Sequence, residues 1–180
     1  MSAEIVPIEP DKVVIAGVKI IKRDVFYDSR GFLIENFDED KEGDKSVYSY
    51  ASLTHPGEAR DIDRFHLHFK QQDRFTVVLG RMYILVFDKR ENSSTYGKIE
   101  VIEAKGGNIE IKEKTSLPCY TITIPEGIYH GIMNPGPGVA MIINHPTERY
   151  NPEDEGRIPF SDTPIPSMNN ETIDWGKVKR

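Results

Sequence analysis

The sequence lacks the features of secreted, membrane-spanning and nucleic-acid-binding proteins. Its 180 residues include one cysteine, Cys119, which excludes an internal disulfide and fits a reducing compartment. The longest uninterrupted apolar run, Met82 to Phe87, is far shorter than the ~20 residues that cross a bilayer. Residues 1–4 offer no basic region before an apolar core, and the net charge of −6 argues against a nucleic-acid groove. We therefore expect a soluble, cytoplasmic protein that binds neither membrane nor nucleic acid.

Helical patterns are also scarce. The 12 prolines and 14 glycines are spread along the chain, and no window combines helical apolar spacing with caps. The β-branched and aromatic residues instead form ten short runs, which we predict as strands. Glycines predict tight turns at Gly80 and at Gly106-Gly107. The predicted strands are residues 13–21, 32–37, 46–52, 62–69, 74–79, 82–88, 98–103, 108–112, 119–124 and 139–145.

Ten short strands with tight turns indicate an all-β sandwich or barrel, and 180 residues suit a single domain. Residues 1–11 and the tail beyond Pro146 show little apolar periodicity. We therefore predict one domain over residues 1–180, with a core of about residues 13–146. The segment 147–180 is predicted to pack as an extended C-terminal arm.

The first half of the stretch from Ile62 to Gly80 alternates between polar and apolar residues, as in a strand with one face of reactive side chains and one apolar face. With period two, Arg64, His66 and His68 share one face, while the aromatic and aliphatic residues between them share the other. Asp73 follows at the start of the next predicted strand. A single histidine is usually a hydrogen-bonded core or surface residue. Two histidines at i and i+2 with a nearby carboxylate are instead placed to bind one ion or one substrate.

A second stretch, from Ile124 to Asn134, pairs with the first. Together HxH, the following acid and Gly80, then PxGxxHxxxN, resemble the two signature motifs of the cupin superfamily. Asp73 stands where glutamate is usual, and Arg60 and Cys119 replace the leading glycines. The resemblance implies an all-β double-stranded β-helix, or jelly roll.

A narrower resemblance covers about Val13 to Trp175. The segment DSRGFLIENF, by itself a turn entering an edge strand, resembles the DxRGxFxExF motif of the dTDP-4-dehydrorhamnose 3,5-epimerase (RmlC-like) family. DKR, STYG, IPEGIYHG, YNPEDEG and IDW follow in the family's order. This resemblance implies a cofactor-free epimerase or isomerase of a nucleotide-linked 4-keto-6-deoxy sugar. It also implies a homodimer in which the region around Arg30 reaches the partner's nucleotide.

The same resemblance implies roles for individual residues. His66 falls on the family's catalytic base and Asp162 on the carboxylate that orients it. A carboxylate behind an imidazole fixes its tautomer and raises its basicity, as removal of a proton next to a keto group requires. Positions that hold the substrate or its diphosphate correspond to Arg30, Glu35 and His130. The family's arginine lies three residues before the base, whereas Arg64 lies two before it; period two turns Arg64 to the same face, so we assign it to diphosphate binding as well.

Three departures change the chemistry of the pocket. Asn144 stands in place of the family's proton-donating tyrosine; a neutral amide cannot donate that proton, so we assign Asn144 to substrate binding. Asp73 replaces a lysine, and His68 replaces a glutamine. His66, His68, Asp73 and His130 then form the ligand set of metal cupins, whose N and O donors suit Fe, Mn, Ni or Zn.

Three hypotheses remain open from the sequence. The first is the metal-free epimerase or isomerase with His66 as base. The second is a metal-dependent cupin enzyme, either an oxygenase or a metallo-isomerase, that uses the three histidines and Asp73. The third is a sugar-binding cupin without catalysis.

Overall fold

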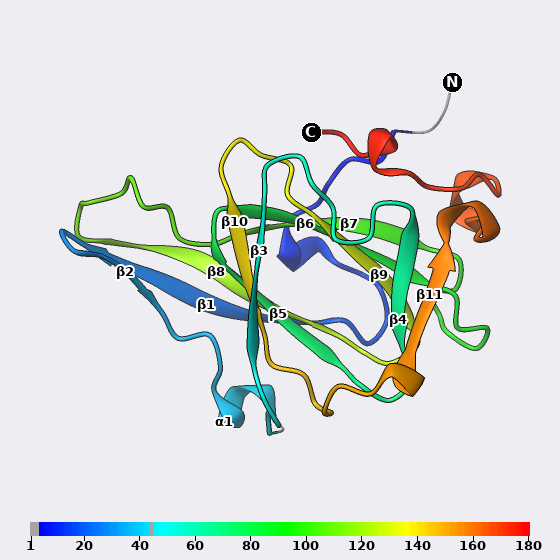
Figure 1. Cartoon of the computed structure of the whole chain (residues 1–180), viewed down its shortest axis with the longest axis horizontal. Helices are drawn as coiled ribbons and strands as arrows, with labels where there is room; N and C mark the ends of the chain where they lie inside the picture. Colours follow the sequence, from blue (N-terminus) through cyan, green and yellow to red (C-terminus); the bar gives the residue numbers. More distant parts are fainter. Residues whose placement is uncertain (1–3, 44) are drawn as a thin grey trace.

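The computed structural model describes residues 4–43 and 45–180, and these form antiparallel strands with little helix (Figure 1). The one α-helix among them, α1 (Glu39–Glu42), has four residues and begins at Asp38, whose side chain accepts a hydrogen bond from the Asp40 amide. Short 3₁₀ turns lie at Pro10–Lys12, Pro152–Asp154, Phe160–Asp162, Pro166–Met168 and Trp175–Lys177. The strands are β1 (Lys19–Asp28), β2 (Gly31–Ile34), β3 (Tyr50–Thr54), β4 (Arg64–His68), β5 (Asp73–Leu79), β6 (Arg81–Asp88), β7 (Ile99–Lys105), β8 (Thr115–Ile124), β9 (Ile128–Met133), β10 (Ala140–Asn144) and β11 (Glu155–Pro159).

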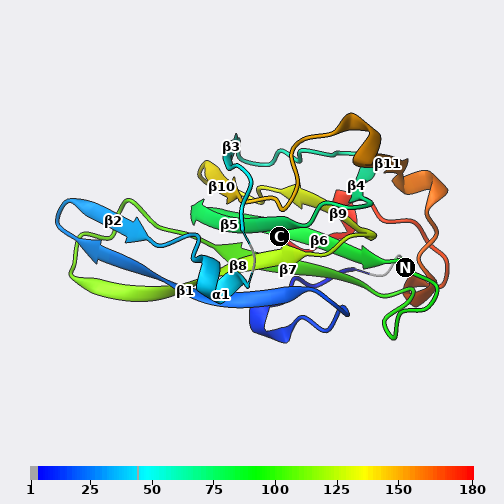
Figure 2. The ribbon, with the colours of Figure 1, turned by 90° about the horizontal axis from the view of Figure 1, so that it is seen from below.

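The strands form two sheets. The six-stranded sheet has the order β2-β1-β8-β5-β10-β3, and the five-stranded sheet has the order β11-β4-β9-β6-β7. Neighbours in each sheet are antiparallel, and the two sheets enclose a common apolar core. The predicted all-β jelly roll is confirmed (Figures 1 and 2).

Strand β6 shows why the five-stranded sheet is apolar on both faces. Met82, Ile84 and Val86 point into the core between the sheets, which is filled with residues such as Phe75 and Ile122. The alternate residues point to the outer face, as period two requires. There they join a second apolar cluster made of Phe65, Tyr83, Leu85, Phe87, Val101, Met133, Phe160, Ile165, Met168, Ile173, Trp175 and Val178.

The segment from β11 to Val178 covers that outer face and so packs against the core as the predicted C-terminal arm. Phe160, Ile165 and Trp175 are each at most 6% exposed. The Trp175 indole N–H donates to the Asp61 carbonyl, which fixes the segment against the start of β4. Its apolar residues lie on 3₁₀ turns and bends and therefore follow neither a strand nor a helix period. Their burial could for that reason not be predicted from the sequence.

Most predicted strands are confirmed, but three predictions need correction and two strands were not predicted. The predicted strand 13–21 belongs to β1, which begins only at Lys19, and residues 108–112 form a turn in which the Asn108 side chain accepts from the Glu110 amide. The glycine pair 106–107 therefore starts a loop, not a hairpin, whereas Gly80 does link β5 to β6 with a φ of 72°. Strands β9 and β11 were not predicted; β9 lies within the motif stretch from Ile124 to Asn134, and β11 follows the YNPED residues of the YNPEDEG motif.

None of the helices in the described part of the chain is long and apolar enough to span a membrane.

Candidate active site

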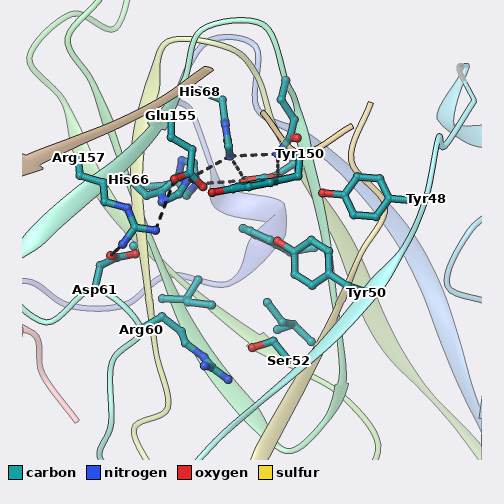
Figure 3. Close-up of a pocket in the computed structure, with 17 residues that line it drawn as sticks. Tyr48, Tyr50, Ser52, Arg60, Asp61, His66, His68, Tyr150, Glu155 and Arg157 are labelled. Atoms are coloured by element: carbon teal, nitrogen blue, oxygen red, sulfur yellow. Dashed lines mark hydrogen bonds and ion pairs between the residues drawn. The ribbon is translucent and has the colours of Figure 1, made fainter. Parts of the chain in front are cut away.

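A pocket of about 540 Å³ opens between the two sheets and collects side chains from both. The five-stranded sheet supplies His66, His68 and His130, and the six-stranded sheet supplies Asp73 and Tyr50. Figure 3 shows His66 and Arg157 on one side of this pocket and Tyr48 and Tyr50 on the other. The predicted chemical face of β4 therefore lines a cavity in which a small molecule can bind.

Strand alternation and register position the three histidines. In β4, Phe65 and Leu67 are buried on the outer face of the five-stranded sheet. Because side chains alternate along a strand, His66 and His68 lie on the other face and point into the pocket. His130 on β9 lies directly opposite His66 in the β4–β9 register. Two neighbouring strands thus bring three of the chain's five histidines to one place.

The histidine nitrogens converge with the Asp73 carboxylate. His66 Nε2 lies 3.0 Å from His68 Nε2, and Asp73 Oδ2 lies 3.2 Å from His130 Nε2 and 3.5 Å from His68 Nε2. Ligand-capable atoms of all three histidines lie within 4.8 Å of one another. His130 Nδ1 lies 3.0 Å from the Ile128 carbonyl, an acceptor that requires a proton on Nδ1 and leaves Nε2 facing Asp73.

Asp73 is held as a carboxylate. Gln71 and Asn144 donate to its Oδ1 at 2.9 and 2.7 Å. Burial raises the pKa of Asp73, but contacts with His130, His68 and Asn144 outweigh burial and lower it to about 2. The Asp73 carboxylate therefore gives the pocket a fixed negative charge at neutral pH.

The two β4 histidines are neutral. Burial, followed by the neighbouring His130 and His68, lowers the pKa of His66 to about 3. Burial also lowers the pKa of His68, against the attraction of Asp73. The carboxylate of Glu155 lies 3.7 Å from His66 Nε2. His66 and His68 therefore present unprotonated nitrogens, which suits either a proton acceptor or a metal ligand.

Five predicted site residues lie outside the pocket, and Asp162 and Arg64 are the first two of them. Asp162 is exposed in a 3₁₀ turn and accepts from the Ser161 hydroxyl, so it does not orient His66; Glu155 is the carboxylate beside that ring. Arg64 begins β4 at its exposed end and pairs with Asp63 at 2.7 Å. The predicted alternation of Arg64 with His66 therefore does not bring its guanidinium into the cavity.

Arg30 and Glu35 lie on a different part of the surface. Both line a separate hollow along the β1–β2 hairpin, which extends away from the rest of the chain (Figure 2). The Arg30 side chain is 88% exposed and pairs with Asp28 at 2.5 Å. Neither residue contributes to this chain's own pocket, so the predicted role of Arg30 requires a second subunit.

Asn144 is fully buried and does not line the cavity, contrary to its predicted contact with substrate. Its Oδ1 accepts from the Arg74 amide at 2.8 Å. Its Nδ2 donates to Asp73 and, at 3.0 Å, to the Tyr50 hydroxyl. Asn144 therefore holds other pocket residues in place.

Several pocket residues were not predicted from the sequence, although strand alternation places them on the pocket face. Tyr48, Tyr50 and Ser52 recur at period two, and all three line the pocket. Glu155 and Arg157 likewise alternate on β11, with Arg157 opposite His66 in register. Arg60, in the loop before β4, has no such pattern.

Comparisons with known proteins agree with the fold and show the family. The family model described as dTDP-4-dehydrorhamnose 3,5-epimerase matches residues 12–175. The chain is 33% identical over 151 residues to a probable low-salt glycan biosynthesis epimerase of Haloferax volcanii, covering 81% of this chain and 88% of the relative. It is also 33% identical over 155 residues to the spore coat polysaccharide biosynthesis protein SpsL of Bacillus subtilis, covering 84% and 93%.

Solved structures share the fold. A dTDP sugar isomerase of Desulfovibrio desulfuricans has a TM-score of 0.69 at 19% identity and covers 84% of this chain and 90% of its own. The dTDP-6-deoxy-D-glucose-3,5-epimerase of Legionella pneumophila, in complex with dTDP-4-keto-L-rhamnose, has a TM-score of 0.67 at 24% identity and covers 93% and 84%.

Proposed function

We propose, from the premise that the chain belongs to the dTDP-4-dehydrorhamnose 3,5-epimerase family, that its pocket epimerises a nucleotide-linked 4-keto-6-deoxy sugar without a cofactor. The chain is thus an enzyme of the sugar-epimerase class. The observation that carries the assignment of its base is the neutral His66 imidazole in a cavity shared by both sheets.

In this proposal His66 removes a proton from the carbon next to the keto group. In the free pocket burial keeps its imidazole neutral and weakly basic. A bound diphosphate adds negative charge, which favours the protonated imidazole, and Glu155 at 3.7 Å acts in the same direction. Substrate binding therefore raises the basicity of His66 at the step that needs it.

We assign the diphosphate to Arg60 and Arg157 instead of Arg64, because both line the pocket. Arg157 lies opposite His66 in the β11–β4 register and is held by Asp61 and Glu155, each at 3.6 Å. Arginine suits a diphosphate because its planar fork can donate two hydrogen bonds to one phosphate.

The wild-type protein tests the function directly. Incubated in D₂O with a dTDP-4-keto-6-deoxy sugar, it is expected to incorporate deuterium next to the carbonyl, as mass spectrometry would detect. The matching dTDP-sugar without the keto group should remain unlabelled, since its C–H bonds are not acidified. A protein that binds the nucleotide sugar but labels neither compound would be a sugar-binding cupin without catalysis.

We also propose that the enzyme is a homodimer joined through the β1–β2 hairpin. Phe26 and Leu33 lie opposite each other in this hairpin and are 49% and 57% exposed. An apolar surface on a projecting hairpin marks an interaction site, and pairing there would place Arg30 against a second subunit.

Arg30→Lys is expected to raise the KM for the nucleotide sugar with a smaller change in kcat. Lysine keeps the charge but loses the bidentate fork, so ground-state binding weakens more than chemistry does. Steady-state kinetics on the purified variant measure both constants. An unchanged KM would leave Arg30 as a turn residue paired with Asp28.

Mixed dimers show whether Arg30 acts across the interface. Chains carrying Arg30→Ala and chains carrying His66→Ala are unfolded together and refolded. If Arg30 serves its partner, each heterodimer holds one pocket with both residues intact, and activity returns. If each Arg30 served its own pocket, or if the protein stayed monomeric by light scattering, mixing would restore nothing.

A second candidate function is metal-dependent catalysis, favoured by the convergence of His66, His68 and His130 beside Asp73. Neutral imidazoles and a carboxylate are ligands that Fe, Mn, Ni and Zn accept. Such an ion would supply a Lewis acid that polarises a substrate oxygen, as in a metallo-isomerase or an oxygenase. His66 would then be a ligand and not a base, so metal content separates the two candidates.

We further propose that residues 1–180 form a single domain in the cytoplasm. The covered outer face of the five-stranded sheet ties residues 147–180 to the core, so calorimetry should record one unfolding transition. Two separate transitions would divide the chain, and recovery in a membrane or secreted fraction would contradict the location.

A further inference from the structure

We propose that Tyr50 donates the proton that completes epimerisation, on the face of the sugar opposite His66. This inference rests on the proposed epimerase function. It supplies a proton donor for a pocket in which Asn144 stands where the family has a tyrosine. Strand position, hydrogen bonding and ionisation of the phenol support it independently.

Tyr50 and His66 lie on opposite walls of the pocket. His66 is on β4 of the five-stranded sheet, and Tyr50 is on β3, the edge strand of the six-stranded sheet. Both line the same cavity, and Figure 3 shows them on opposite sides of it. Inversion at a carbon requires removal of the proton from one face and delivery to the other. A sugar bound between these walls meets that requirement.

Register places the Tyr50 phenol where Asn144 leaves space. Asn144 on β10 lies directly opposite Tyr50 on β3. Paired residues on neighbouring strands project from the same face, so a short amide at position 144 leaves room for the longer tyrosine beside it. The hydroxyl that residue 144 cannot provide is therefore available from the adjacent strand.

The hydrogen bonds of Asn144 leave the Tyr50 proton free. Because Asn144 Oδ1 accepts from the Arg74 amide, its Nδ2 must be the donor toward Tyr50 and Asp73. The Tyr50 oxygen thus accepts at 3.0 Å and is held in position. Its own O–H is not used in that contact and can be donated to a molecule in the pocket.

The ionisation of Tyr50 agrees with a donor. Burial, and then the negative charge of Asp73, raise the pKa of Tyr50 to about 12. The phenol is therefore protonated at neutral pH. Once it has given up its proton, the Asn144 amide hydrogen bond stabilises the phenolate oxygen.

The proton and electron balance of the step is complete. His66 takes the proton from the carbon next to the carbonyl, and the C–H electron pair moves to form the enolate. The carbonyl then re-forms as the same carbon takes the Tyr50 proton on its other face. Water removes the proton from His66 and returns one to the phenolate, so no oxidant or reductant is needed.

Tyr50→Phe separates the two half-reactions. In D₂O, the variant should continue to exchange deuterium into the keto sugar, because His66 returns a deuteron to the face from which it took the proton. Formation of the inverted sugar, followed by NMR, should fall by ~10²-fold or more, the usual contribution of a proton donor. The control Tyr96→Phe removes an exposed phenol from outside the pocket and should invert at the wild-type rate.

Inversion by Tyr50→Phe at the wild-type rate would overturn the assignment, as would parallel loss of exchange and inversion in a folded variant. If the phenylalanine variant does not fold, difluorotyrosine at position 50 lowers the phenol pKa with little change of shape. It should shift the alkaline limit of inversion to lower pH, whereas the same replacement at position 96 should not. An unmoved limit overturns the proposal. Absence of exchange in the wild type would instead refute the proposed function.

Discussion

Replacing His66 with alanine is expected to slow solvent deuterium exchange into a dTDP-4-keto-6-deoxy sugar by ~10²–10⁴-fold, the range that a general base contributes. The ring lines an open pocket, and its neighbours on β4, Phe65 and Leu67, hold the strand against the outer core. Loss of the imidazole therefore removes the proton acceptor without opening a hole in either apolar cluster. Exchange rates measured by mass spectrometry on the two proteins give the ratio.

The matched control is His55→Ala, which removes an exposed histidine from a loop outside the pocket. It should exchange at the wild-type rate, and circular dichroism should show the same strand content for both variants. Exchange by His66→Ala at the wild-type rate would remove His66 from the role of base. Glu155, the carboxylate beside it, would then be the next residue to test.

Metal content is expected to decide between the two candidate functions, with His68→Gln as the informative variant. If the native protein binds an ion, loss of this ligand should lower metal content by ~10-fold or more, because changes even around a ligand cost that much. Ligands ~2.1 Å from one ion lie about 3.0–3.4 Å apart; the His66–His68 and His130–Asp73 separations of 3.0 and 3.2 Å fall in this range, and the His68–Asp73 separation of 3.5 Å slightly exceeds it.

The number of protons on the His130 ring also distinguishes a bound ion from a hydrogen-bonded cluster. If hydrogen bonds alone explain both contacts of His130, its ring must carry two protons, one toward the Ile128 carbonyl and one toward Asp73. A bound ion needs only the Nδ1 proton, because it takes the Nε2 lone pair. The two arrangements therefore differ in the protonation state of His130, which ¹⁵N NMR of the ring reports.

The measurement uses protein purified without a histidine tag and analysed by plasma mass spectrometry. Metal-free protein is then titrated with Co²⁺, whose visible absorption reports nitrogen and oxygen ligation. The control His55→Gln removes a histidine elsewhere and should bind as the wild type does. Stoichiometric metal that persists in both His68→Gln and Asp73→Ala would exclude this ligand set. A native protein without metal and without a Co²⁺ spectrum would leave the cofactor-free epimerase.

The fold and the shared face of His66 and His68 could be predicted from the sequence, because both depend on local alternation and on motifs. His66 and His68 were placed on one face by period two, and the structure directs both into the pocket. His130 was brought to them only by the β4–β9 register, a long-range pairing that the motif resemblance implied.

The predicted pocket positions of Arg64 and Asp162 were wrong because they depend on tertiary packing, which local sequence patterns do not show. Arg64 alternates in phase with His66, but it lies at the exposed end of its strand, where its guanidinium forms an ion pair with Asp63. Asp162 lies in a turn whose orientation depends on the packing of Phe160 beneath it. The alternation of Tyr48 and Tyr50 was readable, but which face of the edge strand meets the cavity depends on the pairing of β3 with β10.

The covering of the five-stranded sheet also orders events during synthesis. Strands β4, β6, β7 and β9 leave the ribosome before residues 155–178. Phe65, Leu85 and Phe87 therefore remain exposed to solvent until the C-terminal segment that packs on them is translated. A nascent chain stopped near residue 146 exposes that apolar face and lacks the Glu155–Arg157 wall of the pocket. Such intermediates are the ones that chaperones bind. Completion of the active pocket and protection from aggregation therefore occur in the same late step.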